Sequence, residues 1–214
     1  VPGGNIWTSA NSGDKWSKVA SLGLVVVDGG EFSSNALGDK LALASSRGIW
    51  ISEDYGVTWK KRDPPNTSDH QWRSITSDDT GTKLAAVSTA TRSGADRFEM
   101  AAAPPMSDPS WSGGTIWTSV DSGVTWKEQT SEAKFWTSIS SDATGTKLVA
   151  AERLVNVNEE AIELMRMMSF GRGGGETIEA DWRGGEIWTS LDSGVSWSLS
   201  LNGKKKGGLV STAW

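Results

Sequence analysis

The chain has 214 residues, a formal net charge of −5 and no cysteine, and 13 of its residues are tryptophan. An acidic balance does not favour nucleic acid as a partner. A sequence without cysteine holds no disulfide, zinc–thiolate centre or thiol nucleophile. No apolar run approaches the about 20 residues that a membrane-spanning helix requires, so the sequence predicts no transmembrane segment.

The first predicted element is a hairpin, and it recurs three times along the chain. The copies span 6–16, 49–59, 116–126 and 187–197; each opens with Ile-Trp, passes through Ser-x-Asp-x-Gly or a variant, and ends on Trp. The opening residues alternate between apolar and polar, as in a half-buried strand. Asp followed two residues later by Gly is typical of a tight turn. Each copy therefore predicts two antiparallel strands joined by a turn, with the tryptophans mainly in the core.

A second repeated phrase precedes the last three hairpins. Segments 72–84 and 136–148 share Ser-Asp-x-Thr-Gly-Thr-Lys-Leu, and 32–41 is a shorter relative. A Gly-containing turn followed by an apolar run predicts another hairpin. Two hairpins per repeat give four antiparallel strands, which is the blade of a β-propeller. The predicted fold class is therefore all-β.

The repeats divide the chain into blades. We expect full blades over 22–63, 71–130 and 135–200, half a blade over 1–20 and the start of one over 207–214. The 214 residues are thus predicted to form a single β-propeller or part of one. Propellers close by packing blades around an axis. Two arrangements remain open: the partial blades complete each other in a four-bladed ring, or the chain is a fragment of a larger chain or assembly.

Two blades carry long insertions between their second and third strands. The insertions cover 88–114 and 152–185, where the first full blade has only a few residues. Loops of this length in a compact domain are usually functional or disordered. Residues 158–171 begin with a capping Asn and an acidic turn and end on Gly, which predicts one short helix in the second loop. Both insertions must leave on the face opposite the Ser-x-Asp-x-Gly turns.

The pattern Ser-x-Asp-x-Gly-x-Thr-Trp resembles the Asp-box, or BNR repeat, of the sialidase-like β-propellers. The resemblance implies that the boxes hold hairpins together and that the opposite face carries the ligand site. The first copy has Asn11 and Lys15 where the pattern has Asp and Thr, so the pattern predicts its turn but not its side-chain bonding. The implied structural residues are Ser52, Asp54, Gly56, Trp59, Ser119, Asp121, Gly123, Trp126, Ser190, Asp192, Gly194 and Trp197.

The sequence does not favour an enzyme of the sialidase type. Sialidases use a Tyr nucleophile, and the sole tyrosine, Tyr55, lies inside one of the repeated turns, on the wrong face. Other propeller glycoside hydrolases use paired carboxylates, whose spacing the sequence does not give. We therefore assign no catalytic residue, no metal ligand and no cofactor.

Two functions of different classes remain open. The first is a noncatalytic module that binds a protein or a glycan through loops 88–114 and 152–185. Arg and Trp are frequent interface anchors, and the candidates in these loops are Arg92, Arg97, Trp111, Arg172 and Trp182. The alternative is a fragment of a sialidase-like or other glycoside hydrolase propeller. The localisation is not determined, although the acceptor sequon at Asn66 favours a secreted or organelle-lumenal protein.

Overall fold

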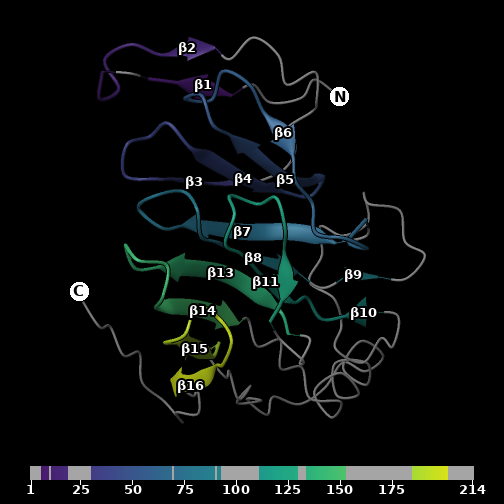
Figure 1. The fold of residues 1–214 in the computed structure, drawn as a ribbon. Coiled ribbons are helices and arrows are strands. Elements are labelled where there is room, and N and C mark those ends of the chain that lie inside the picture. The colour runs from purple at the N-terminus through teal and green to yellow at the C-terminus, as the bar shows by residue number, and fades with distance from the viewer. Residues whose placement is uncertain are drawn as a thin grey trace, which may run out of the picture.

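The computed structural model describes residues 6–9, 11–18, 30–68, 70–89, 91–92, 111–129, 134–152 and 185–201. In these residues the regular structure is entirely β. Three four-stranded antiparallel sheets are stacked face to face, and a two-stranded hairpin lies beyond the first sheet (Figure 1). The described part of the chain contains no helix long and apolar enough to cross a membrane.

Each four-stranded sheet is a blade whose strands follow one another in chain order. Blade 1 comprises β3 (Glu31–Ser34), β4 (Leu41–Ser45), β5 (Gly48–Ser52) and β6 (Lys60–Lys61). Blade 2 comprises β7 (Gln71–Ser77), β8 (Leu84–Thr89), β11 (Ile116–Ser119) and β12 (Lys127–Glu128). Blade 3 comprises β13 (Trp136–Ser141), β14 (Leu148–Glu152), β15 (Ile187–Ser190) and β16 (Ser198–Leu201). The separate hairpin comprises β1 (Trp7–Thr8) and β2 (Ser17–Lys18).

This arrangement is that of β-propeller blades, as the sequence predicts. The first strands of the blades contact one another, since β7 packs against both β3 and β13. The short helix predicted over 158–171 lies outside the described residues.

Two apolar cores hold the blades together. Between blades 1 and 2, Ile49 and Ile51 meet Trp72 and Ile75. Between blades 2 and 3, one core includes Ala85, Val87 and Ile116 from blade 2 and Trp136, Ile139 and Leu148 from blade 3. Strand β8 sends Leu84 and Ala86 into the first core and Ala85 and Val87 into the second. A strand covered on both faces is apolar throughout, which explains the Leu-Ala-Ala-Val sequence of β8.

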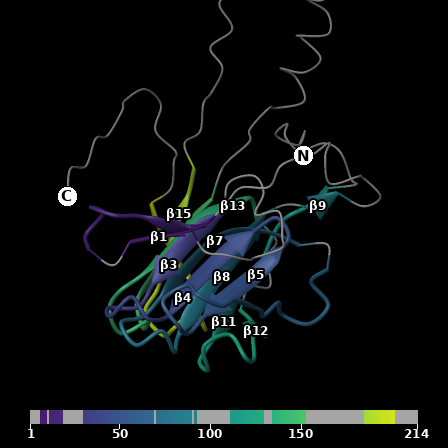
Figure 2. The same ribbon diagram turned by 90° about the horizontal axis from the view of Figure 1, so that it is seen from above.

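Turns gather on one face of the stack, here called the turn face. Backbone hydrogen bonds connect them from blade to blade: Ala36 N–H donates to Asp79 O at 3.0 Å, and Asp79 N–H donates to Ala143 O at 2.9 Å. The opposite face, the loop face, carries the connections between the second and third strands of each blade. Viewed along the stack, β9 (Thr91–Arg92) lies beyond the sheets on the side away from the β11–β12 turn (Figure 2).

Candidate binding face

The two ends of the blade 2 insertion pair with each other as a two-stranded ribbon on the loop face. Strand β9 pairs antiparallel with β10 (Trp111–Ser112), and Arg92 stands opposite Trp111 in the register. The ribbon is fixed to the blade below it, because Thr115 N–H donates to Ser88 Oγ at 2.9 Å and Ser88 N–H donates to Thr115 O at 3.0 Å. Two of the five candidate contact residues are thus cross-strand neighbours. The other three, Arg97, Arg172 and Trp182, lie outside the described residues.

The base of the ribbon is also tied to blade 3. Gly114 N–H donates to Lys134 O at 2.8 Å, and Lys134 N–H donates to Gly114 O at 3.0 Å. Lys134 precedes the first strand of blade 3, so these two bonds fix the ribbon relative to the next blade. The strand ends at 152 and 187, between which the second insertion runs, belong to that same blade.

An ionic cluster lies at the loop-face end of blade 3. Lys134 Nζ is 3.3 Å from Glu152 Oε2, with side-chain exposures of 18% and 8%, and 4.6 Å from the Trp188 ring centroid. Trp188 Nε1 donates to Glu152 Oε2 at 3.3 Å. A largely buried carboxylate is tolerated here because a cation and an indole donor both contact it. The cluster therefore anchors the strand ends that frame the second insertion.

An aromatic cluster occupies the corresponding place in blade 2. The His70 ring centroid lies 5.7 Å from that of Trp72 and 6.5 Å from that of Trp117. Trp117 Nε1 donates to Thr115 Oγ1 at 2.8 Å, which connects this cluster to the base of the ribbon. His70 and Trp117 hold the repeat positions that Lys134 and Trp188 hold in blade 3.

Two indole donors at this end of the blades lack a hydrogen-bond partner. Trp72 and Trp136 lie at the start of the first strands of blades 2 and 3 and are 3% and 2% exposed. Neither Nε1 has an acceptor in the described structure. Buried donors are normally paired, so each such group calls for an explanation. Sequence reasoning assigned these tryptophans to the core and did not single them out. The repeat alignment is the signal that could have done so, since both stand at the same position of their repeats.

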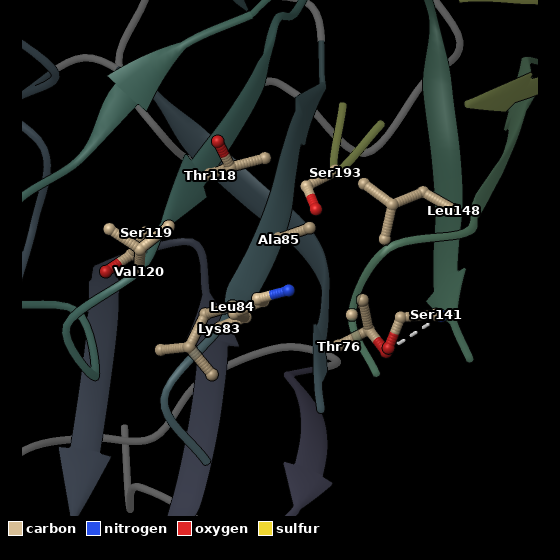
Figure 3. Close-up of a pocket in the computed structure, with 11 residues that line it drawn as sticks. Thr76, Lys83, Leu84, Ala85, Thr118, Ser119, Val120, Ser141, Leu148 and Ser193 are labelled. Atoms are coloured by element: carbon tan, nitrogen blue, oxygen red, sulfur yellow. Dashed lines mark hydrogen bonds between the residues drawn. The ribbon is translucent and has the colours of Figure 1, made fainter. Parts of the chain in front are cut away.

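A small crevice on the turn face lies where blades 2 and 3 meet (Figure 3). Its polar lining is already engaged: Thr76 and Ser141 hydroxyls lie 3.1 Å apart, and Lys83 Nζ donates to Thr144 O at 3.0 Å. The crevice is therefore part of the seam between the blades.

The Ser-x-Asp-x-Gly turns share one hydrogen-bond pattern on the turn face. In blade 2, Asp121 Oδ1 accepts from the Ser119 hydroxyl at 2.9 Å and from Thr125 N–H at 2.8 Å, and Oδ2 accepts from the Thr125 hydroxyl at 2.6 Å. Ser119 Oγ also accepts from Gly123 N–H at 2.9 Å. The turns at Asp54 and Asp192 repeat these bonds.

These bonds stabilise the ionised carboxylates. The Ser196 hydroxyl, then the Ser196 N–H, lowers the pKa of Asp192 to about 2. Hydroxyl bonds from Thr58 and Thr125 likewise lower the pKa values of Asp54 and Asp121.

The variant first turn keeps more of the pattern than its sequence predicts. Asn11 Oδ1 accepts from the Ser9 hydroxyl at 3.0 Å and from Lys15 N–H at 2.8 Å. An amide oxygen serves as well as a carboxylate oxygen for these two bonds. Lys15 has no hydroxyl, so the third bond of the other turns is absent from this one.

No protein-family model matches the chain, and no curated protein matches it. Among solved structures, the GH74 enzyme of Niastella koreensis aligns with a TM-score of 0.61 and 15% identity, over 94% of this chain and 27% of that chain. The GH74 xyloglucanase of Xanthomonas campestris aligns with a TM-score of 0.54 and 14% identity, over 91% and 26%. An ancestral GH74 enzyme aligns with a TM-score of 0.53 and 13% identity, over 89% of this chain and 28% of that chain.

The chain thus spans about a quarter of the length of these similar structures. All three are β-propeller proteins, and the likeness supports the propeller fold of this chain. Identities of this size carry the fold alone.

Proposed function

We propose that this β-propeller is a noncatalytic interaction module that binds a protein or a glycan through its loop face. The observation that carries the proposal is the ribbon β9–β10, which pairs Arg92 with Trp111 and is tied at its base to Lys134 of the adjacent blade. A ligand meeting the ribbon would also meet the blade that bears the second insertion. Arg and Trp supply charge, hydrogen bonding and a large apolar surface, the usual combination of binding hot spots.

The base of this face offers further chemistry. The unpaired indole donors of Trp72 and Trp136 could each be satisfied by a carbonyl or hydroxyl oxygen. Glu152 is engaged by Lys134 and Trp188, so we assign it an anchoring role and not that of a catalytic acid.

We further propose that the repeated turns are Asp-boxes of the sialidase-like kind and that their residues are structural. Three observations support this: the same bonds recur in three blades, they are local to each turn, and they lie on the face opposite the ribbon. Ligand contact is therefore expected from the loop face and not from Asp54, Asp121 or Asp192.

The proposal is tested by presenting the chain to a glycan array and to a random-peptide display library, followed by calorimetry on the ligand found. We expect Arg92→Ala and Trp111→Ala to weaken binding at least about tenfold, as loss of an interface anchor does. Lys127→Ala is the control, because Lys127 is exposed on strand β12, outside the loop-face connections. Binding that survives both ribbon substitutions would contradict the proposal.

The alternative, a piece of a glycoside hydrolase, is tested with the same glycans. Release of new reducing ends by the purified chain would favour hydrolysis over simple binding. Stable binding without release would favour the interaction module.

A further inference from the structure

The outer face of blade 3 carries an ordered but uncovered patch, here called the tail face. Two cross-strand rows form it, and both are fixed by the register of β13, β14 and β15. The rows are Ser138, Ala151 and Ile187, and Ser140, Val149 and Thr189. The two serines are exposed, Val149 is 40% exposed, and the other three are partly exposed.

The equivalent rows of blade 2 are buried by blade 3. They are Ser74, Val87 and Ile116, and Thr76, Ala85 and Thr118, and all six residues are buried. The two hydroxyl residues of these rows on β7 each accept a backbone hydrogen bond from blade 3. Ser74 Oγ accepts from Ile139 N–H at 3.0 Å, and Thr76 Oγ1 accepts from Ser141 N–H at 3.1 Å. The tail face therefore repeats a surface that, one blade earlier, receives another blade.

The glycine of each repeated turn lies against the third strand of the preceding blade. A Cβ placed on Gly194 would lie 3.0 Å from Thr118 Cγ2, and one on Gly123 would lie 3.2 Å from Ile51 Cγ1. Thr118 and Ile51 hold the repeat position of Thr189. On the tail face Thr189 is partly exposed.

The opposite end of the stack presents the complementary surface, here called the head face. Its hairpin β1–β2 packs on blade 1 in the same way, with Thr8 Cγ2 3.1 Å from a Cβ placed on Gly56. The head face itself is formed by Trp7 and Trp16, which are 52% and 60% exposed. Large exposed aromatic rings that lie side by side are typical of interaction surfaces.

The equivalents of these two tryptophans pack against a preceding blade. Trp117, which corresponds to Trp7, is 8% exposed and belongs to the core between blades 1 and 2. Trp126, which corresponds to Trp16, packs against that core, and its Nε1 donates to Arg62 O at 2.8 Å. In blade 3, Trp188 and Trp197 pack against the core shared with blade 2.

We propose that the chain associates head to tail, with the head face of one copy seated on the tail face of a second copy. Figure 1 shows the two faces at opposite ends of the stack, so one copy does not bring its own faces together. Trp7 and Trp16 would cover Val149, Ala151 and Thr189 as Trp188 and Trp197 cover their blade 2 counterparts. Such a contact is heterologous: it joins different surfaces and produces a ring or an open chain of copies.

Sedimentation velocity on the full chain over a range of concentrations tests this proposal. We expect dimers or larger species that grow with concentration. Val149→Glu blocks the tail face and Trp7→Glu blocks the head face, and each variant alone should be monomeric. Val120→Glu is the matched control, because Val120 is 66% exposed on the turn face, outside both proposed surfaces, and it should associate as the parent does.

An equimolar mixture of the two blocked variants is the decisive test of head-to-tail association. Each retains one intact face, so an equimolar mixture should form a one-to-one dimer and nothing larger. Circular dichroism shows whether each variant is folded. If Val149→Glu does not fold, Ser140→Lys replaces it as the tail-face variant. A parent chain that stays monomeric throughout, or blocked variants that associate as the parent does, would overturn the proposal.

Discussion

Ser74 and Ser138 hold the same position in consecutive blades, yet Ser74 is 0% exposed and Ser138 is exposed. The difference is the neighbouring blade. Ser74 Oγ accepts a hydrogen bond from Ile139 N–H, whereas Ser138 faces outward on the last described sheet. A short hydroxyl side chain on one blade thus bonds the backbone of the next, and its contribution depends on whether that next blade is there.

Ser74→Ala should destabilise the chain by about 1–3 kcal/mol, because it leaves the buried N–H of Ile139 without an acceptor. Ser138→Ala should change the unfolding free energy by less than about 0.5 kcal/mol, as for an ordinary surface substitution. Urea unfolding at low protein concentration, where association does not contribute, measures both. Equal losses would show that the serine acts within its own sheet and not across the seam.

Gly194→Ala should be more destabilising than Gly38→Ala. Both glycines have positive φ, +89° and +72°, so both variants incur backbone strain of about 1–3 kcal/mol. Only at Gly194 does the added methyl group also meet the preceding blade; at Gly38 no heavy atom lies within 4 Å. Thermal unfolding of the two variants separates the backbone effect from the contact between blades. Equal shifts in Tm would argue against close packing at Thr118.

Asp121→Ala should lower the unfolding free energy by about 1–2 kcal/mol through the loss of the turn hydrogen bonds. Asp121→Asn should cost less, since the Asn11 turn shows that an amide oxygen keeps two of these bonds. Urea unfolding gives both values, and ligand binding by the folded variants serves as the functional control. Lost binding with unchanged stability would overturn the structural role proposed for the box.

Acid should destabilise the propeller through its turn aspartates. The pKa of Asp192 falls from 3.8 to about 2 on folding, so the folded state binds fewer protons than the unfolded chain between these values. The stabilisation is complete above about pH 4 and is lost as the pH falls toward 2. Asp54, Asp121 and Asp142 have lowered pKa values and add to the same trend.

Urea unfolding at several pH values in this window, for the parent chain and Asp192→Asn, provides the measurement. The variant lacks one titrating group, so its stability should fall less steeply with acid. Identical slopes would mean that the turn bonds do not stabilise the ionised Asp192.

The strands and turns could be predicted from the sequence because their causes are local. Alternation, a turn glycine and an Asp that bonds the backbone four residues later all lie within one repeat. The propeller follows from repetition, because four short strands in each repeat can bury both faces only by stacking. The repeated pattern was therefore sufficient to predict the propeller architecture.

Burial of individual tryptophans could not be predicted in this way. The repeat treats Trp7 and Trp117 alike, but one is 52% exposed and the other 8%. Their surroundings depend on which blade lies next to them, which is information outside the repeat. The pairing of Arg92 with Trp111 was beyond reach for a different reason: the insertion between them has no periodicity from which a register can be inferred.

The blade-to-blade bonds of the turn face have a consequence for engineering. At Ala36 and Asp79 the donor is a backbone N–H, which every residue except proline supplies. The bonds at these two positions therefore tolerate replacement of the side chain by any residue except proline, and the proposed binding ribbon lies on the opposite face. Foreign peptides grafted between Ser88 and Thr115 would inherit a rigid, paired base, so the chain is suited to serve as a display scaffold.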